Sequence, residues 1–586
     1  MNASTFLPTS AEEMRARGWE SCDIVIVTPD AYIDHPSFGM AILGRFLERH
    51  GFRVGILSQP RWKNSAAFLE FGRPNLAFAV SGGAMDSMVI NYTAVGIPRR
   101  DDPYCDEGDP YFLKKGEGKK YRIRPDRVVQ VYCSQIRAAC KGVPIIIGGI
   151  EASLRRIAHY DWWSDTVKRS VLFDSKADLL IYGMGEYALL EAMCALRDNK
   201  ALSDLRIPGT AVVRKSTDDL GDAIQIPSYD EVRADKKSFA KAFCLFEKYS
   251  RHRILAQQQD TRFLVQYPGR LMTTQELDAI YDLPYTRMPH PKYHDIPAYR
   301  MIRDSVTAHR GCYGNCAFCA ITAHQGPEIV SRSKESVLRE IRNLAKVPGF
   351  GGTITDIGGP SANMYGSACA IGGCPTHDCL KDGTVCRNLL PGIRDYISLL
   401  DAASECRGIR HVFIGSGLRF EAPLVPEQFL RKILRANISG HLKIAPESGS
   451  DNVLRHMGKS STSVFNEFYR LYERICREER LTSRLIPYII VGHPGERKED
   501  VYATRDFLMH FRLHGNQFQI FTPSPLTRST AMYYLGYDPC TEEPVEVVRD
   551  RGELETRKRI LTGRDHGKNE VNNFPLLTSK RCSFLP

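Results

Sequence analysis

The stretch Cys312-Tyr-Gly-Asn-Cys316-Ala-Phe-Cys319 is the most informative part of the sequence. Its cysteines follow a C-x3-C-x2-C spacing, which lets one short loop reach three corners of a cubane. A [4Fe-4S] cluster normally takes four thiolates. The loop therefore predicts a [4Fe-4S] cluster held by Cys312, Cys316 and Cys319, with one iron left open to a ligand from outside the chain.

A structural zinc site is the alternative for this loop. A structural zinc site needs a fourth Cys or His ligand and is commonly formed by two C-x2-C pairs. Only Cys316 and Cys319 form such a pair, although His309 and His324 lie near enough in sequence to supply another ligand. The position of the loop directly after a predicted strand at 305–307 favours the cluster.

The composition is that of an ordinary folded protein, with 43% hydrophobic and 25% charged residues in a chain of 586. This length exceeds one hydrophobic core, so two or more domains are expected. No apolar run approaches the roughly 18 residues that cross a bilayer. Residues 1–20 carry charges and lack the apolar segment of a secretory signal. We therefore predict a cytoplasmic protein with no membrane partner.

The chain has 17 cysteines and a formal net charge of +11. Because the cytosol keeps thiols reduced, clustered cysteines are expected to be metal ligands rather than disulfides. The positive balance favours a polyanionic partner such as RNA, but a uniformly solvated basic surface gives the same sum. No tight run of Lys and Arg decides between the two.

Residues 1–295 are predicted to form a Rossmann-like, doubly wound α/β domain, because short apolar strands alternate with helical stretches. The strands are expected at 24–27, 54–57, 76–80, 144–147 and 179–182. Four prolines between 283 and 299 mark the domain boundary, since proline disfavours helix and stiffens a connection.

Residues 296–540 are predicted to form a partial (β/α)6 TIM barrel, because six apolar strands are separated mainly by helical segments. These strands are expected at 305–307, 353–357, 411–414, 442–445, 486–491 and 517–521. A Cys-rich insertion occupies 361–390. Residues 541–586 are polar and weakly periodic, so we expect little fixed structure in this C-terminal tail.

The cysteine segment resembles the cluster loop of the radical S-adenosylmethionine (SAM) superfamily, and Phe318 before its last cysteine matches as well. The resemblance implies that the amino and carboxylate groups of SAM chelate the open iron. It also implies reductive cleavage of SAM to a 5′-deoxyadenosyl radical, with the electron supplied by a reductant such as flavodoxin or ferredoxin. The second half of the chain would then be the radical SAM core.

Gly358 and Gly359 stand in the loop after the second predicted barrel strand. In the superfamily this loop binds the amino group of SAM, so the resemblance implies that these two glycines let backbone carbonyls approach the ligand. Pro360 replaces the acidic residue that is usual there. The missing carboxylate leaves no side chain of this loop assigned to SAM.

Two later segments extend the resemblance. Ile444-Ala-Pro-Glu-Ser-Gly-Ser-Asp is similar to the fourth-strand segment of the methylthiotransferase-like branch, which makes Glu447 and Ser448 candidates for the ribose hydroxyls of SAM. The same residues also fit a helix N-terminus capped by Ser448 or Ser450. Gly492 lies in a Y-I-I-V-G-H-P-G-E run similar to the fifth-strand segment whose backbone meets adenine.

The architecture as a whole, including Asp34-His-Pro-Ser-Phe-Gly39 and Thr522-Pro-Ser-Pro525, looks like the YgiQ family of radical SAM proteins. That family is defined by sequence rather than by a reaction, so the resemblance names no substrate. The polar tail after Pro539 does not continue the family pattern.

Cys369, Cys374, Cys379 and Cys386 fall within eighteen residues, with His377 among them. Four soft ligands in one irregular loop indicate an auxiliary Fe-S cluster or a zinc site. The spacing C-x4-C-x4-C-x6-C is not a standard one, so an insertion with free cysteines is an equal alternative.

The amino-terminal domain occupies the place of a cobalamin domain in another radical SAM branch. The histidine motif D-x-H-x-x-G is not reproduced, because Asp34 and His35 are adjacent and Gly39 lies four residues beyond His35. This departure argues against cobalamin. Three hypotheses follow for function: modification of RNA or protein, small-molecule or cobalamin-assisted radical chemistry, and a non-catalytic Fe-S or zinc scaffold.

Overall fold

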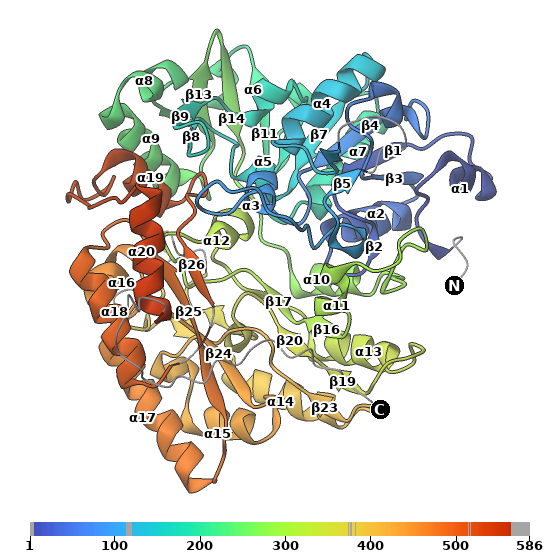
Figure 1. Cartoon of the computed structure of the whole chain (residues 1–586). Coiled ribbons are helices and arrows are strands. Elements are labelled where there is room, and N and C mark those ends of the chain that lie inside the picture. Colours follow the sequence, from blue (N-terminus) through green and yellow to red (C-terminus); the bar gives the residue numbers. More distant parts are fainter. Residues whose placement is uncertain are drawn as a thin grey trace.

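The computed structural model describes residues 5–112, 120–372, 374, 378–380, 383–513, 515 and 517–563. Figure 1 shows two halves in chain order, with the blue to green elements of the first half above the yellow and orange elements of the second. Helix α12 (Ala320–Gln325), which follows the cysteine segment, lies where the two halves meet.

Five parallel strands, in the order β3-β1-β4-β7-β10, form the first half of the large sheet. Their bounds are β1 Ile24–Thr28, β3 Val54–Ser58, β4 Ala77–Ser81, β7 Ile145–Gly148 and β10 Leu179–Ile181. Each coincides with a strand expected from the sequence. The prediction of an α/β fold with a parallel sheet is confirmed.

Helices cover both faces of this sheet because the side chains of β1 alternate between two cores. Ile24 and Ile26 pack with helices α2 (Gly39–Arg49) and α7 (Glu186–Arg197). Val25 and Val27 face the other way and pack with α4 (Val128–Ala139). A strand buried on both faces is typical of a parallel sheet in an α/β protein.

The other edge of the sheet differs from the expectation, because it is mostly antiparallel. After β10 the order continues β11-β14-β13-β12, and three of these contacts are antiparallel. The bounds are β11 Thr210–Arg214, β12 Ile224–Ile226, β13 Leu255–Gln259 and β14 Arg262–Gln266. The sequence of β13 does not read as an apolar strand, because two of its buried side chains are the amides of Gln257 and Gln259. Their carbonyl oxygens accept hydrogen bonds from the backbone N–H groups of Ala158 and Ser170.

Parallel strand pairs follow one another in chain order through the second half. β16 pairs with β20, and β19 pairs with β23. β24 pairs with β25, which in turn pairs with β26. Their bounds are β16 Ser305–Thr307, β19 Thr353–Ile354, β20 Asp356–Gly358, β23 His411–Val412, β24 His441–Glu447, β25 Arg484–Val491 and β26 Phe518–Ile520. These strands fall on the six predicted segments.

Helices separate the strands of the second half. They are α13 Lys334–Leu344, α14 Ile393–Ser404, α15 Glu427–Ala436, α17 Thr462–Glu478 and α18 Lys498–His510. A single core joins strand residues such as Val306 and Ile444 to helix residues such as Ile341 and Phe465. Alternating strands and helices around one core fit the predicted barrel, and its closure around six strands stays a prediction.

The C-terminal tail is more ordered than its polar sequence predicts. Helix α20 (Arg551–Thr562) begins after Asp550, whose side chain accepts the N–H of Glu553, and packs against α18 and β26. Leu554, Arg557 and Leu561 are the buried residues that anchor it. Sequence periodicity missed the helix because tertiary contacts, rather than a wide apolar face, hold it in place. The expectation of little fixed structure from 541 onward is therefore wrong for α20.

Buried polar contacts join the two halves. Arg310 of the second half forms an ion pair of 2.6 Å with Glu186 of α7, and a ring nitrogen of His324 in α12 lies 2.9 Å from the hydroxyl of Ser153. In the described residues no helix has the length and apolar character needed to cross a bilayer.

Candidate functional site

The three cysteines of the loop are half-buried and lie between β17 (His309–Arg310) and α12. Gly311 makes the turn possible: its φ is +85°, and a Cβ there would lie 1.8 Å from the carbonyl oxygen of Glu328. Burial and the two neighbouring thiols raise the pKa of Cys312 to about 11. Burial and the Cys316 thiol also raise the pKa of Cys319. The thiols are thus close enough to influence one another's ionisation.

A buried arginine lies beside this loop. The Nη1 group of Arg419 points at the Cys316 sulfur at 3.7 Å, and the same guanidinium is ion-paired with buried Glu421. Glu421 also accepts a hydrogen bond of 2.6 Å from Ser460. Donors aimed at cluster sulfurs set the potential of a bound cluster. Sequence reasoning missed Arg419, because one arginine after a short strand carries no distinct signal.

Glu447 ends β24 in a left-handed conformation, with φ of +69°. Burial raises the pKa of its carboxyl group, while the charges of Lys459 and Arg419 oppose that rise. The Lys459 ammonium donates to the carbonyl oxygen of Ala445 at 2.6 Å. Glu447 therefore belongs to the same charged group as the arginine beside the cysteine loop, and Lys459 is a second residue that sequence reasoning missed.

Ser448 lies next to this group but its hydroxyl is already engaged. The oxygen lies 3.1 Å from the hydroxyl of Thr504 on α18 and accepts the backbone N–H of Ser450 at 3.2 Å. These bonds tie the end of β24 to α18. A contact between Ser448 and the ribose of SAM stays a prediction.

Gly358 and Gly359 permit close packing at the end of β20. A Cβ on Gly358 would lie 2.8 Å from the Ser416 hydroxyl, and one on Gly359 would lie 2.6 Å from the ring of His309. Burial lowers the pKa of His309 to about 4, so this ring is neutral at pH 7. The structure thus places both predicted glycines against the strand that leads into the cysteine loop.

Gly492 packs against α20. Its φ is +75°, and a Cβ would lie 2.3 Å from Cδ2 of Leu554. Its backbone N–H donates to Glu496 at 2.8 Å, and that carboxylate is also ion-paired with Arg557. The packing of α20 is therefore one reason for a glycine at position 492. The contact of its backbone with adenine stays a prediction.

The four cysteines of the insertion are drawn together by a short antiparallel pair, β21 (Ala368–Cys369) and β22 (Leu389–Leu390). Burial raises the pKa of Cys379 to about 11, and the thiols of Cys386, Cys374 and Cys369 add to that rise. His377 lies outside the described residues. Among those that the structure does describe, in this insertion and in the Cys312 loop alike, no three Cys, His, Asp or Glu side chains gather closely enough to hold a single metal ion. A second metal site stays a prediction.

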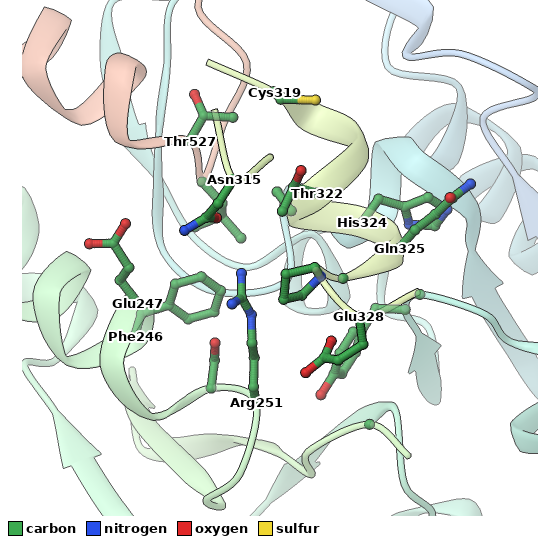
Figure 2. Close-up of a pocket in the computed structure, with 18 of the residues that line it drawn as sticks. Phe246, Glu247, Arg251, Asn315, Cys319, Thr322, His324, Gln325, Glu328 and Thr527 are labelled. Carbon is green, nitrogen blue, oxygen red and sulfur yellow. The ribbon is translucent and has the colours of Figure 1, made fainter. Parts of the chain in front are cut away.

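A cavity of about 920 Å³ borders the cysteine loop. Its walls come from both halves, with Asn315, Cys316 and Cys319 on one side and residues of α7 and α9 (Lys236–Tyr249) on the other. Figure 2 shows Asn315, Cys319, Thr322 and His324 above Phe246 and Arg251.

A second cavity, of about 440 Å³, lies at the carboxyl ends of β1, β4, β7 and β10. Gly359 and His309 of the second half also line it, and His324 and Gln325 of α12 line both cavities. The parallel strands have the order 2-1-3-4-5 along the chain, and ligands of such sheets bind outside the carboxyl ends where the order reverses.

Three family models match successive parts of the chain. A model described as radical SAM N-terminal matches residues 6–305, one for the radical SAM superfamily matches 306–508, and a domain of unknown function matches 516–580. A UPF0313 protein of Methanocella arvoryzae is 44% identical in an alignment of 585 positions that covers 98% of this chain and 96% of the relative. The chain belongs to the UPF0313 family.

Other UPF0313 proteins match as fully. One from Clostridium botulinum is 40% identical, and the match covers 100% of this chain and 91% of the relative. One from Thermotoga neapolitana is 43% identical, and the match covers 93% of this chain and 96% of the relative. The predicted family resemblance is confirmed, and the radical SAM domain supports an enzyme. The matches also run through the tail, so the expectation that it departs from the family pattern is wrong.

Solved structures of radical SAM enzymes are similar to this chain at low identity and with TM-scores below 0.5. The methyltransferase TsrM from Kitasatospora setae, solved with tryptophan and a SAM analogue, gives a TM-score of 0.47 at 15% identity and covers 86% of this chain and 74% of its own. OxsB, solved with aqua-cobalamin, gives a TM-score of 0.46 at 11% identity. The match covers 94% of this chain and 57% of OxsB. TsrM has also been solved with cobalamin and a [4Fe-4S] cluster. The expectation against cobalamin in the UPF0313 chain is not confirmed.

Proposed function

We propose that the protein cleaves SAM reductively on a [4Fe-4S] cluster held by Cys312, Cys316 and Cys319. The supporting observation is a single loop in the radical SAM domain that carries three half-buried thiols, one of which lies beside a buried guanidinium. When bound, the cluster supplies the electron that splits SAM into methionine and a 5′-deoxyadenosyl radical, which takes a hydrogen atom from the substrate.

The chain's own residues bind the cluster and SAM. The thiols must lose their protons to hold iron, so their raised pKa values make cluster assembly release protons. The N–H of Arg419 disperses negative charge at the Cys316 sulfur. Gly358, Gly359, Glu447, Ser448 and Gly492 are the candidate SAM contacts.

The test is anaerobic reconstitution with iron and sulfide, followed by dithionite and SAM, with 5′-deoxyadenosine measured by chromatography and mass spectrometry. The wild-type protein forms this product. Each of Cys312→Ala, Cys316→Ala and Cys319→Ala abolishes it, because a cluster with two protein ligands is not retained. Cys406→Ala is the matched control, since this half-buried thiol donates to the Ala402 carbonyl and lies outside the predicted cluster loop.

Two results would contradict the proposal. Purified protein that takes up zinc in preference to iron would favour the structural zinc alternative. Protein that holds iron yet leaves SAM intact under strong reduction would favour a non-catalytic scaffold. Flavodoxin or ferredoxin is the proposed reductant, and either should replace dithionite in the same assay.

RNA or protein is the first substrate class to test, because the net charge of +11 favours a polyanion. Pure protein should retain RNA at low ionic strength and release it as salt rises. Absence of retention at low salt would argue against RNA.

The second cavity favours a second candidate function, small-molecule or cobalamin-assisted radical chemistry. This cavity lies at the carboxyl edge of the parallel sheet and is lined in part by Gly359 of the predicted SAM loop. Cobalamin retention, seen as visible absorbance after gel filtration, would support it. Colourless protein after incubation with cobalamin would remove that part of the proposal.

A further inference from the structure

Five arginines line the 920 Å³ cavity beside the cysteine loop. Three are neutralised by carboxylates: Arg270 by Glu276 at 2.7 Å, Arg455 by Glu543 at 2.6 Å and Arg528 by Asp538 at 2.9 Å. The remaining two, Arg156 and Arg251, have no such partner within the part of the chain that the structure describes.

Arg251 follows the end of α9, and Figure 2 shows its side chain pointing into the cavity toward Asn315. Among the described residues, no carboxylate oxygen lies within 4.0 Å of its guanidinium. Glu328 and Glu247 act on it only at longer range, and burial lowers its pKa. The cavity therefore holds a half-buried cation whose hydrogen-bond donors have no partner in the described residues.

Arg156 is 5% exposed and carries a second charge without a counterion. It donates to the side chain of Gln266 at 3.0 Å and lies over the rings of Tyr182 and Phe246, at 4.6 and 4.8 Å. Burial, with a smaller contribution from the like charge of Arg251, lowers its pKa to about 10. Neutral amides and aromatic rings hold this guanidinium in place without cancelling its charge.

Two like charges in one cavity are costly, because each has lost water and neither has an anion at ion-pair distance in the described residues. The cost is recovered when a ligand supplies the negative charge. An arginine fork matches the geometry of carboxylate and phosphate, and 920 Å³ is enough for a small-molecule ligand or a terminal group of a larger one.

We propose that Arg251 and Arg156 form an oxyanion site that binds a carboxylate or phosphate group of the substrate. This substrate role rests on the proposed radical SAM function, because it uses the same cavity beside the cysteine loop. Arg251 supplies the free hydrogen-bond donors, and Arg156 supplies long-range attraction from a fixed position. Asn315, on the cysteine loop, lies on the facing wall.

The test uses the full-length protein without SAM or reductant and two probes, inorganic phosphate and acetate, each against chloride at equal ionic strength. Binding is followed by calorimetry. At least one probe should bind the wild-type protein, and Arg251→Gln should weaken it by about tenfold or more, because a charge-assisted pair is lost. Binding of phosphate alone or acetate alone identifies the anion, and binding of neither overturns the proposal.

Arg253→Gln is the matched control. Arg253 lies two residues away but is paired with Asp222 at 2.7 Å and does not line the cavity. This variant should bind the probe as the wild type does. An equal loss of probe binding in Arg251→Gln and Arg253→Gln would show a non-specific effect of net charge and would overturn the site.

Thermal stability provides a second readout. Since Arg251 has no ion pair in the described residues, Arg251→Gln should leave the unfolding midpoint unchanged or raise it. A fall of several degrees would show that Arg251 holds the fold together, and would overturn the proposal. Arg251→Lys, which keeps the charge but loses the fork, should bind the probe with intermediate strength.

The outcome is separable from that of the proposed function. Formation of 5′-deoxyadenosine without probe binding would reject the oxyanion site alone, and probe binding without SAM cleavage would reject the radical SAM function alone. SAM binding should be equal in wild type and Arg251→Gln. A loss of SAM binding in this variant would assign Arg251 to SAM itself and overturn the substrate role.

Discussion

Buried ions decide much of the chemistry at the scale of single residues. Arg419 and Glu421 form an ion pair with side chains only 6% and 1% exposed. The guanidinium favours the ionised carboxylate and, with Ser460, holds the pKa of Glu421 low, at about 2. The same guanidinium points at the Cys316 sulfur. One buried pair thus fixes a donor beside the proposed cluster.

Removing one partner of this pair should destabilise the protein strongly. Arg419→Met leaves the Glu421 carboxylate buried without a counterion, which costs about 3–5 kcal/mol. We expect the unfolding midpoint of the cluster-free protein to fall by several degrees in calorimetry. The double variant Arg419→Met/Glu421→Met should recover most of the loss. A double variant no more stable than the single one would contradict the account.

Buried histidines should make the protein sensitive to acid. Burial lowers the pKa of His493 to about 3, and its ring packs against Phe521 with one nitrogen 2.6 Å from the Ser529 hydroxyl. The unfolded chain takes up a proton near pH 6.5, whereas the folded protein does so only near pH 3. Unfolding therefore binds protons, and stability falls as pH falls from about 6.5 toward 3.

The measurement is the unfolding midpoint across this pH range in wild type and His493→Gln. The variant loses one titrating group, so its midpoint should change less steeply with pH. Parallel curves for the two proteins would show that His493 does not contribute.

At the scale of elements, α20 completes the second half by packing on the end of β25. Leu554 lies against Gly492, and Arg557 reaches Glu496 in the following loop, at 3.3 Å. A helix that is polar on most of its surface is held here by the buried leucines Leu554 and Leu561 and by the ion pairs of buried Arg557.

Gly492→Ala tests this packing. The new methyl group would meet Leu554 at 2.3 Å in a left-handed backbone, which should cost about 1–3 kcal/mol. We expect a lower unfolding midpoint, partly restored by Leu554→Ala in the same chain. If Gly492→Ala keeps its midpoint and loses SAM binding, the glycine serves adenine rather than α20.

At the scale of the whole molecule, segments far apart in sequence meet around the large cavity. Cys244 of α9 and Cys540, which follows α19 (Arg528–Leu535), are free thiols whose sulfurs lie 2.6 Å apart, although 296 positions separate them. This contact joins the first half to the C-terminal segment beside Arg528, which lines the cavity.

Mild oxidation should join these two cysteines. Diamide accepts two electrons and two protons from a pair of thiols, so cluster-free protein should give a crosslinked peptide containing Cys244 and Cys540, with two hydrogens fewer. The crosslink should raise the unfolding midpoint, because it closes a long loop of the unfolded chain. Cys540→Ser should abolish both effects and Cys194→Ser neither. A peptide map without this crosslink would contradict the contact.

The local sequence by itself determined the parallel strands and the cysteine loop. Apolar runs such as 24–27 and 486–491 lie where β1 and β25 form, because a strand buried between helices needs continuous apolar residues. The C-x3-C-x2-C spacing likewise lies within one loop, so the proposed cluster ligands are readable without knowledge of the fold.

Only the tertiary structure decided the antiparallel edge, helix α20 and the charged groups around the cysteine loop. β13 is a strand of glutamines whose backbone partners lie about a hundred positions away, near 158 and 170. Arg419 stands 103 positions from Cys316, and Arg251 reaches the cavity beside the cysteine loop from the other half. The physical reason is that hydrophobic periodicity records whether a residue is buried, whereas ion pairs and cavities depend on which distant segments folding brings together.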